Sequence, residues 1–126
     1  EMFGFDARPK PLKISPSMRL DGVIKAMRDL HWSSGGTDCS LPMTYALDNK
    51  MSGVDKFCVY TDNETYAGRM QPVEALAQYR SWYNADAKLI VCGTSVSHFT
   101  IADPKDPGML DIVGFDSAAP QLIQSF

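Results

Sequence analysis

The sequence predicts an α/β fold in which an open, mostly parallel sheet carries helices on both faces. Two short apolar runs, Lys56–Tyr60 and Lys88–Cys92, each end at a polar or turn-forming cluster, as strands buried on both faces do. Between them, apolar residues recur at helical spacing from Val73 to Tyr83, behind Pro72, which suits a first helical turn. A strand, a helix and a second strand in this order place the two strands parallel in one sheet. The expected architecture is therefore Rossmann-like.

Further helices and strands flank this unit. An apolar stripe from Leu20 to Leu30 predicts a helix that packs one face on the sheet, with Ser17 as its cap and the Ser-Ser-Gly-Gly cluster at residues 33–36 as its end. The other expected elements are a strand at Met2–Phe5, a helix at about Leu41–Lys50, a short strand at Phe99–Ile101, an element that starts within Met109–Val113, and a last helix at about Ser117–Phe126 capped by Asp116.

Length and composition are those of one globular domain. The chain has 126 residues, of which 44% are hydrophobic, enough to build one core. It shows no targeting signal and no apolar run near the roughly 18 residues that a membrane span needs, so we expect no membrane partner. Its three cysteines, Cys39, Cys58 and Cys92, are odd in number and far apart, which fits a reducing compartment and predicts a cytoplasmic location. A net charge of −3 repels phosphate polymers, so we expect no nucleic-acid binding by this chain itself.

A glycine-containing loop precedes the helix expected at Leu41. Gly35 and Gly36 allow the backbone to turn tightly, while Thr37 and Asp38 present side-chain oxygens near a helix N-terminus. In open parallel sheets, ligands bind beyond the carboxyl ends of the strands, in segments that connect a strand to a helix. We therefore expect this loop to contribute to a ligand site.

A second polar loop, with Asp62, Asn63 and Glu64, follows the strand that ends at Tyr60. A hydroxyl from the first loop and a carboxylate from the second are hard oxygen ligands, of the kind that Mg²⁺ binds while it keeps several waters. On spacing alone a structural explanation is equally good. In that explanation Asp38 or Ser40 caps the next helix, and Asp62-Asn63 makes a turn.

Zinc and cysteine chemistry are weaker alternatives. His31, His98 and the three cysteines include no Cys-x-x-Cys or His-x-x-x-His pair that would place two zinc ligands together. Cys39 lies at an expected helix N-terminus, where the pKa of a thiol falls, so a cysteine-nucleophile enzyme stays open as an alternative. No histidine is placed by the sequence to act as its base.

Together, these segments resemble the Ro (TROVE) RNA-binding autoantigen family. The similar segments are Gly35–Met43, Thr61–Gly68, Ala87–Gly93, Phe99–Pro104, Gly108–Asp111 and Gly114–Asp116, so the resemblance covers roughly Ala26–Phe126. In that family they belong to a von Willebrand factor A domain, which follows a ring of helical repeats that binds RNA. The resemblance implies that residues 1–126 are the C-terminal two-thirds of such a domain.

The resemblance also implies a metal-ion-dependent adhesion site for Mg²⁺ or another divalent cation. In this sequence Thr37 would supply a hydroxyl ligand and Asp62 a carboxylate, usually through water. The family site also needs an Asp-x-Ser-x-Ser loop after the first strand, and this sequence contains none. Met2–Asp6 corresponds best to the second strand, so the first strand and first helix have no counterpart in these 126 residues. Metal binding by this chain alone is therefore expected to be weak or absent.

A Ro-like chain of this kind is expected to be a binding module and not an enzyme. By resemblance, a divalent ion at the completed site bridges to a carboxylate on a protein partner. Another domain of the whole protein would bind small non-coding RNA and serve in its quality control. A cysteine-nucleophile enzyme on the same fold and a structural domain that has lost metal binding are the alternatives.

The missing first strand predicts a gap in the sheet, between the strand at Met2 and the strand that ends at Tyr60. Each unpaired N–H or C=O group buried there would cost about 1–3 kcal/mol. We therefore expect a strand from a separate chain, exchange between copies of this chain, or a longer native protein. Without these, Met2–Phe5 should move inward beside Phe57–Tyr60.

Overall fold

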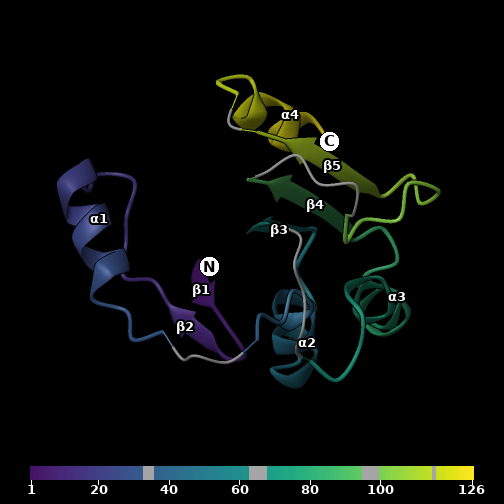
Figure 1. Cartoon of the computed structure of the whole chain (residues 1–126). Helices are drawn as coiled ribbons and strands as arrows, with labels where there is room; N and C mark the ends of the chain where they lie inside the picture. Colours follow the sequence, from purple (N-terminus) through teal and green to yellow (C-terminus); the bar gives the residue numbers. More distant parts are fainter. Residues whose placement is uncertain (33–35, 63–67, 95–99, 115) are drawn as a thin grey trace.

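The fold is that of a computed structural model, which describes residues 1–32, 36–62, 68–94, 100–114 and 116–126. Figure 1 shows a small N-terminal hairpin with helix α1, and a three-stranded sheet with the other helices. In chain order the elements are β1 (Phe3–Phe5), β2 (Pro9–Pro11), α1 (Leu20–Arg28), α2 (Leu41–Asp48), β3 (Lys56–Thr61), α3 (Pro72–Trp82), β4 (Lys88–Gly93), β5 (Met109–Val113) and α4 (Ala119–Ser125).

The main sheet is parallel throughout, and its strand order is β3-β4-β5. From Leu89 onward every residue of the middle strand β4 is buried, which confirms the prediction of a strand covered on both faces. The same prediction is wrong for β3, where Cys58 and Tyr60 are exposed. Burial alternates along β3, so one face of this strand is covered and the face with Cys58 and Tyr60 is not; its outer flank also pairs with no described strand.

Helices α2 and α3 pack together, and α3 covers one face of the sheet through Tyr79. The Tyr79 ring meets that of Phe57 edge-on, with 4.9 Å between centroids. Its hydroxyl donates to the carbonyl of Met51 at 2.6 Å and accepts from the amide of Val54 at 3.1 Å. These bonds tie α3 to the segment between α2 and β3. The helix begins at Pro72, as predicted.

Helix α4 is held on the opposite side of the sheet by two lysines from neighbouring strands (Figure 1). Lys56 donates to the carbonyls of Ile123 and Gln124 at 3.1 and 2.9 Å, and Lys88 donates to that of Phe126. Cations are favourable at the C-terminus of a helix, where carbonyls have no partner within the helix. Helices therefore cover both faces, as the sequence predicts.

Two local predictions near the C-terminus need correction. Asp116 accepts a hydrogen bond from the amide of Ala118 at 2.7 Å, so it closes a turn before α4 and does not cap the helix. The short strand expected at Phe99–Ile101 is not formed by its two described residues. There, the hydroxyl of Thr100 accepts from the amide of Ala102 at 3.1 Å and makes a turn.

The N-terminal strand is confirmed at Phe3–Phe5, but it pairs with Pro9–Pro11 in an antiparallel hairpin. It has not moved inward beside β3, and none of the described strands bridges the two. The helix predicted from Leu20 is also confirmed, although Arg19 and not Ser17 is its N-cap residue. Its expected packing on the sheet is wrong, because no residue of α1 is buried. Among the described strands the main sheet ends at β3, and Figure 1 shows α1 beyond that edge, away from the sheet.

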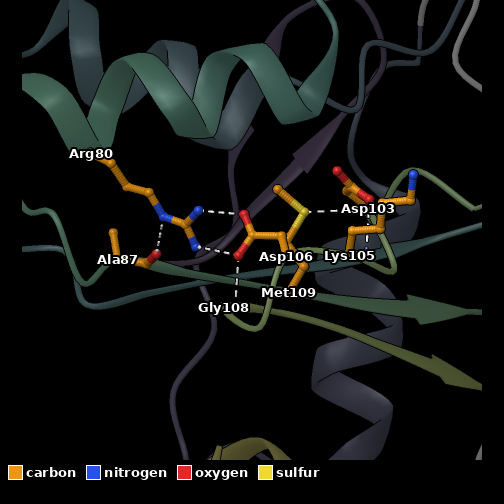
Figure 2. A network of polar contacts seen from close by, with 7 residues as sticks. All are labelled: Arg80, Ala87, Asp103, Lys105, Asp106, Gly108 and Met109. Atoms are coloured by element: carbon orange, nitrogen blue, oxygen red, sulfur yellow. Dashed lines mark hydrogen bonds and ion pairs between the residues drawn. The ribbon is translucent and has the colours of Figure 1, made fainter.

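A polar network fixes the loop between β4 and β5 to α3 (Figure 2). Arg80 donates to both carboxylate oxygens of Asp106 and, at 2.7 Å, to the carbonyl of Ala87. The amide of Gly108 adds a bond to Asp106 at 2.8 Å. A Cβ atom at Gly108 would lie 2.2 Å from the guanidinium of Arg80, so only glycine fits there without a shift. Hydrogen bonds from Arg80 hold the pKa of Asp106 below its ordinary value of 3.8, against the opposing effect of burial.

Candidate functional site

The carboxyl ends of the three parallel strands lie together at one edge of the main sheet. The strands end at Thr61, Gly93 and Val113, and the register places these ends side by side. The amide of Thr94 donates to the carbonyl of Thr61 at 2.8 Å, which continues the pairing past the last strand residue. Asp62 follows directly and is exposed at this edge. This is the position at which open parallel sheets bind ligands.

The first loop reaches the same edge from the other side. The thiol of Cys39 lies 3.4 Å from the hydroxyl of Thr61, and both side chains are buried. The contact brings residues 36–40 to the end of β3, next to Asp62. This loop was expected to connect a strand to a helix, but the described element before it is α1. Its position at the edge therefore depends on packing and not on a preceding strand.

Asp38 keeps the first loop in shape and leads it into α2. Its Oδ1 accepts from the amide of Ser40 at 2.9 Å and from its hydroxyl at 2.6 Å. Its own amide donates to the carbonyl of Asp6 at 2.9 Å, which links the loop to the N-terminal hairpin. These bonds give Asp38 a structural role within the loop, but it does not cap α2, whose N-cap residue is Ser40 and whose N-terminus has no side-chain cap hydrogen bond. The hydrogen bonds of this buried carboxylate stabilise the conformation of the loop.

The second loop returns to Asp38 at Gly68. The φ angle of Gly68 is +109°, a conformation that favours glycine. A Cβ atom at this position would lie 2.5 Å from Oδ1 of Asp38, so the close approach of the two loops also requires glycine. The loops that sequence reasoning selected are therefore packed against each other. Gly68 and Asp38 lie far apart in the sequence, so no sequence pattern predicts their contact.

The side chains expected to bind a metal fit Mg²⁺ in type but not in number. Thr37 is partly buried and Asp62 is exposed, and Gly36 directly precedes Thr37 in the chain. Gly35, Asn63 and Glu64 fall outside the described residues. Within the described ranges, no group of three or more His, Cys, Asp or Glu side chains could hold a metal ion. A hydroxyl and a carboxylate would leave most of an octahedral shell to water or to another segment.

The cysteines do not have the surroundings of a nucleophile. Cys39 is fully buried, so a substrate has no access to its thiol. Partial loss of hydration raises the pKa of the thiols of Cys58 and Cys92, which disfavours the reactive thiolate, even though Cys58 is exposed. The same effect raises the pKa of Tyr60, which shares a hydrogen bond with Cys92. The geometry therefore weakens the cysteine-enzyme alternative.

Comparison with known proteins identifies the domain. The family model described as "Ro60 vWA domain" matches residues 1–126. The chain belongs to the Ro60 vWA domain family. The resemblance noted in the sequence is thereby confirmed, and so is the von Willebrand factor A type of α/β fold.

Two curated relatives of this Ro60 vWA domain are named RNA-binding protein RO60. One, from Deinococcus radiodurans, is 43% identical over 123 residues, which are 98% of this chain and 23% of the relative. The other, from Caenorhabditis elegans, is 50% identical over 93 residues, which are 73% of this chain and 14% of the relative. The chain thus spans less than a quarter of the length of these relatives.

A solved structure has the same arrangement of elements. The crystal structure of the Deinococcus radiodurans RO (RSR) protein matches with a TM-score of 0.79 at 43% identity. The match covers 98% of this chain and 24% of the solved one. None of the helices in the described part of the Ro60 vWA domain is long and apolar enough to cross a membrane.

Proposed function

We propose that this Ro60 vWA domain is a protein-interaction module of a Ro-like ribonucleoprotein and has no catalytic activity of its own. The observation that carries the proposal is the junction of the two polar loops, where Cys39 meets Thr61 and Gly68 approaches Asp38. It supports the proposal because it brings oxygen-bearing side chains to the edge at which open parallel sheets commonly bind ligands. The three cysteines are free, which supports a reducing, cytoplasmic setting.

The module would bind its partner through a divalent cation, of which Mg²⁺ suits the donors best. Thr37 would contribute a hydroxyl and Asp62 a carboxylate, while Asp38 supports the loop. Gly35, Gly36, Asn63 and Glu64 belong to the same two loops and would shape the ligand-binding surface. When bound, the ion supplies a positive charge that attracts a carboxylate of the partner protein.

Small non-coding RNA would be bound, and subjected to quality control, by another part of the whole protein. The relatives are named RNA-binding proteins, but this chain corresponds to less than a quarter of their length. Its net charge of −3 does not favour association with a phosphate backbone. Electrophoretic shift with a small structured RNA at physiological ionic strength should show no complex with residues 1–126.

Calorimetric titration with MgCl₂ tests the metal proposal. The chain of 126 residues should bind Mg²⁺ weakly or not at all, because two side chains leave most of the shell to water. In a chain extended by an Asp-x-Ser-x-Ser segment, binding should appear, and T37A or D62A should remove it. D86A, at an exposed position after α3, is the matched control. Micromolar affinity in the unextended chain, or unchanged affinity in both T37A and D62A, would contradict the assignment.

A further inference from the structure

The N-terminal hairpin holds the first loop of the candidate site at both ends. Before the loop, the carbonyl of His31 accepts a hydrogen bond from the ammonium of Lys10, in β2. After it, the amide of Asp38 donates to the carbonyl of Asp6 at 2.9 Å. Thr37 lies between these two anchors, one residue before Asp38. The position of its hydroxyl at the edge of the sheet therefore depends on the hairpin.

One ion pair joins the two anchors. Lys10 donates to Oδ2 of Asp6, and the amide of Arg8 donates to Oδ1 at 2.9 Å, inside the turn between β1 and β2. The side chain of Asp6 is 8% exposed and that of Lys10 is 19% exposed. Loss of one partner from a pair with so little contact to water leaves the other charge uncompensated. The lysine that holds the start of the loop is thus bound to the residue that holds its end.

The hairpin is also shaped to receive Trp32, the residue after His31. Gly4 lies opposite Lys10 in the register of the hairpin. A Cβ atom at Gly4 would lie 2.7 Å from the Trp32 ring, so the missing side chain makes room for that ring. The ammonium of Lys10 lies 4.9 Å from the ring centroid, within the range of a cation–π interaction. Lys10 therefore fixes the start of the loop through a carbonyl and through an aromatic side chain.

The contacts of the hairpin reach both flanks of the loop, whereas an ion pair that only stabilised the hairpin would need neither. We propose that Asp6 and Lys10 are a positioning pair that sets the place of Thr37 at the candidate metal site, an inference that rests on the proposed function. Neither side chain is a ligand, because the pair acts through His31 and Asp38. By linkage, a cation bound through Thr37 should in turn hold both anchors more tightly.

Hydrogen exchange followed by NMR tests the positioning in the chain of 126 residues. K10M removes the ammonium and keeps most of the aliphatic stem. The amide of Asp38 should then exchange at least about tenfold faster, because charge-assisted bonds that hold the loop are lost. The amide of Val91, in the middle strand of the sheet, should keep its wild-type rate. K10R retains the charge and should restore most of the protection of Asp38.

A second variant and a matched control complete this experiment. D6N/K10M leaves no unpaired buried charge, so it keeps the test valid if K10M fails to fold, and it should accelerate the exchange of Asp38 in the same way. The control is K25M, because Lys25 forms an ion pair with Asp29, also four residues away, on exposed α1. K25M makes the same change of charge and should leave the exchange of Asp38 unchanged.

Calorimetric titration with MgCl₂ connects the pair to the metal site, in the chain extended by an Asp-x-Ser-x-Ser segment. K10M should weaken Mg²⁺ binding at least about tenfold, while K10R and K25M keep the wild-type affinity. If the extended wild-type chain binds no Mg²⁺, the proposed function fails, and the exchange experiment still decides whether the pair holds the loop.

Two results would overturn the proposal. One is an amide of Asp38 that exchanges in K10M and in D6N/K10M at the wild-type rate, or that accelerates no more than the amide of Val91. The other is an unchanged Mg²⁺ affinity of K10M in an extended chain that binds the ion, since a role in folding alone would lower its melting temperature without changing that affinity.

Discussion

The N-terminal region, residues 1–32, and the central body, residues 36–113, both contain apolar residues at regular spacing. The central body buries such residues, and the N-terminal region does not. Every buried apolar side chain in the described residues lies between Cys39 and Ala102. In residues 1–32 the one buried residue is Asp6, a carboxylate. Helix α1 has apolar residues at helical spacing, yet Leu20 is 73% exposed. The comparison teaches that a periodic apolar pattern identifies a face suited to burial, while burial itself depends on a neighbouring surface.

The largest difference between the two regions should appear in leucine-to-alanine substitutions. Leu76 of α3 is fully buried, so L76A should lower the free energy of unfolding by about 2–5 kcal/mol through lost contacts and a cavity. L20A makes the same chemical change on exposed α1 and should alter stability by less than about 0.5 kcal/mol. Urea denaturation followed by circular dichroism measures both.

The pair of variants also tests whether α1 has a partner surface in solution. A loss of more than about 2 kcal/mol in L20A would show that Leu20 is buried there, and the contrast between the regions would fail. A small loss in L76A would contradict the core described for the central body.

A smaller effect is expected from acid, and it should act on the central body through Asp106. Because its folded pKa lies below the ordinary 3.8, the Arg80 interaction stabilises the fold above that pH and is lost as pH falls further. D106N removes the carboxylate and should cost about 1–3 kcal/mol at neutral pH, but much less near pH 2. Unfolding curves measured from pH 7 to pH 2 give the comparison.

The control for this experiment is D21N, at an exposed position on α1. D21N should follow the wild-type pH profile closely, because surface ion pairs contribute little. A wild-type stability that stays constant from pH 5 to pH 2, or a D106N profile as steep as that of the wild type, would exclude Asp106 as the acid-sensitive group.

The smallest expected effect is a difference in labelling rate among the cysteines of the folded chain. Thiol labelling reports on the central body alone, because residues 1–32 contain no cysteine. At pH 7 Cys58 should react first with a thiol reagent, and slowly, since its pKa is raised. Cys39 should react only on unfolding. Mass spectrometry of partly labelled protein gives the order. A fast-reacting Cys39 in the folded chain would restore the cysteine-enzyme alternative.

The sequence predicts the central body well because its signals are local. Continuous apolar runs mark β3 and β4, and Pro72 with its helical spacing marks α3. The prolines of Pro9–Pro11 hide β2, because proline is uncommon in strands away from edges. The exposed face of β3 was unpredictable for another reason. It depends on which segment lies beside the strand, and the strand's own residues do not contain that information.

The candidate site, too, could be predicted from the sequence only in part. The two loops could be selected from residue type and from their positions beside expected strands and helices. The contacts that join them, between Cys39 and Thr61 and between Asp38 and Gly68, link residues 22 or more positions apart and follow from packing. The same is true of the bond between Arg80 and Asp106, which are 26 residues apart. Whether Thr37 and Asp62 bind a cation stays a prediction.

The way α4 is attached has a mechanical consequence. None of its residues is buried, and its described bonds to the sheet are those that Lys56 and Lys88 donate to its last carbonyls. A pulling force applied at Phe126 would load these few polar contacts first and peel the helix away. The hydrogen-bonded ladder between β4 and β5 would bear load only afterwards. The C-terminal end would then act as a compliant tether, and the strands behind it as the stiff part of the domain.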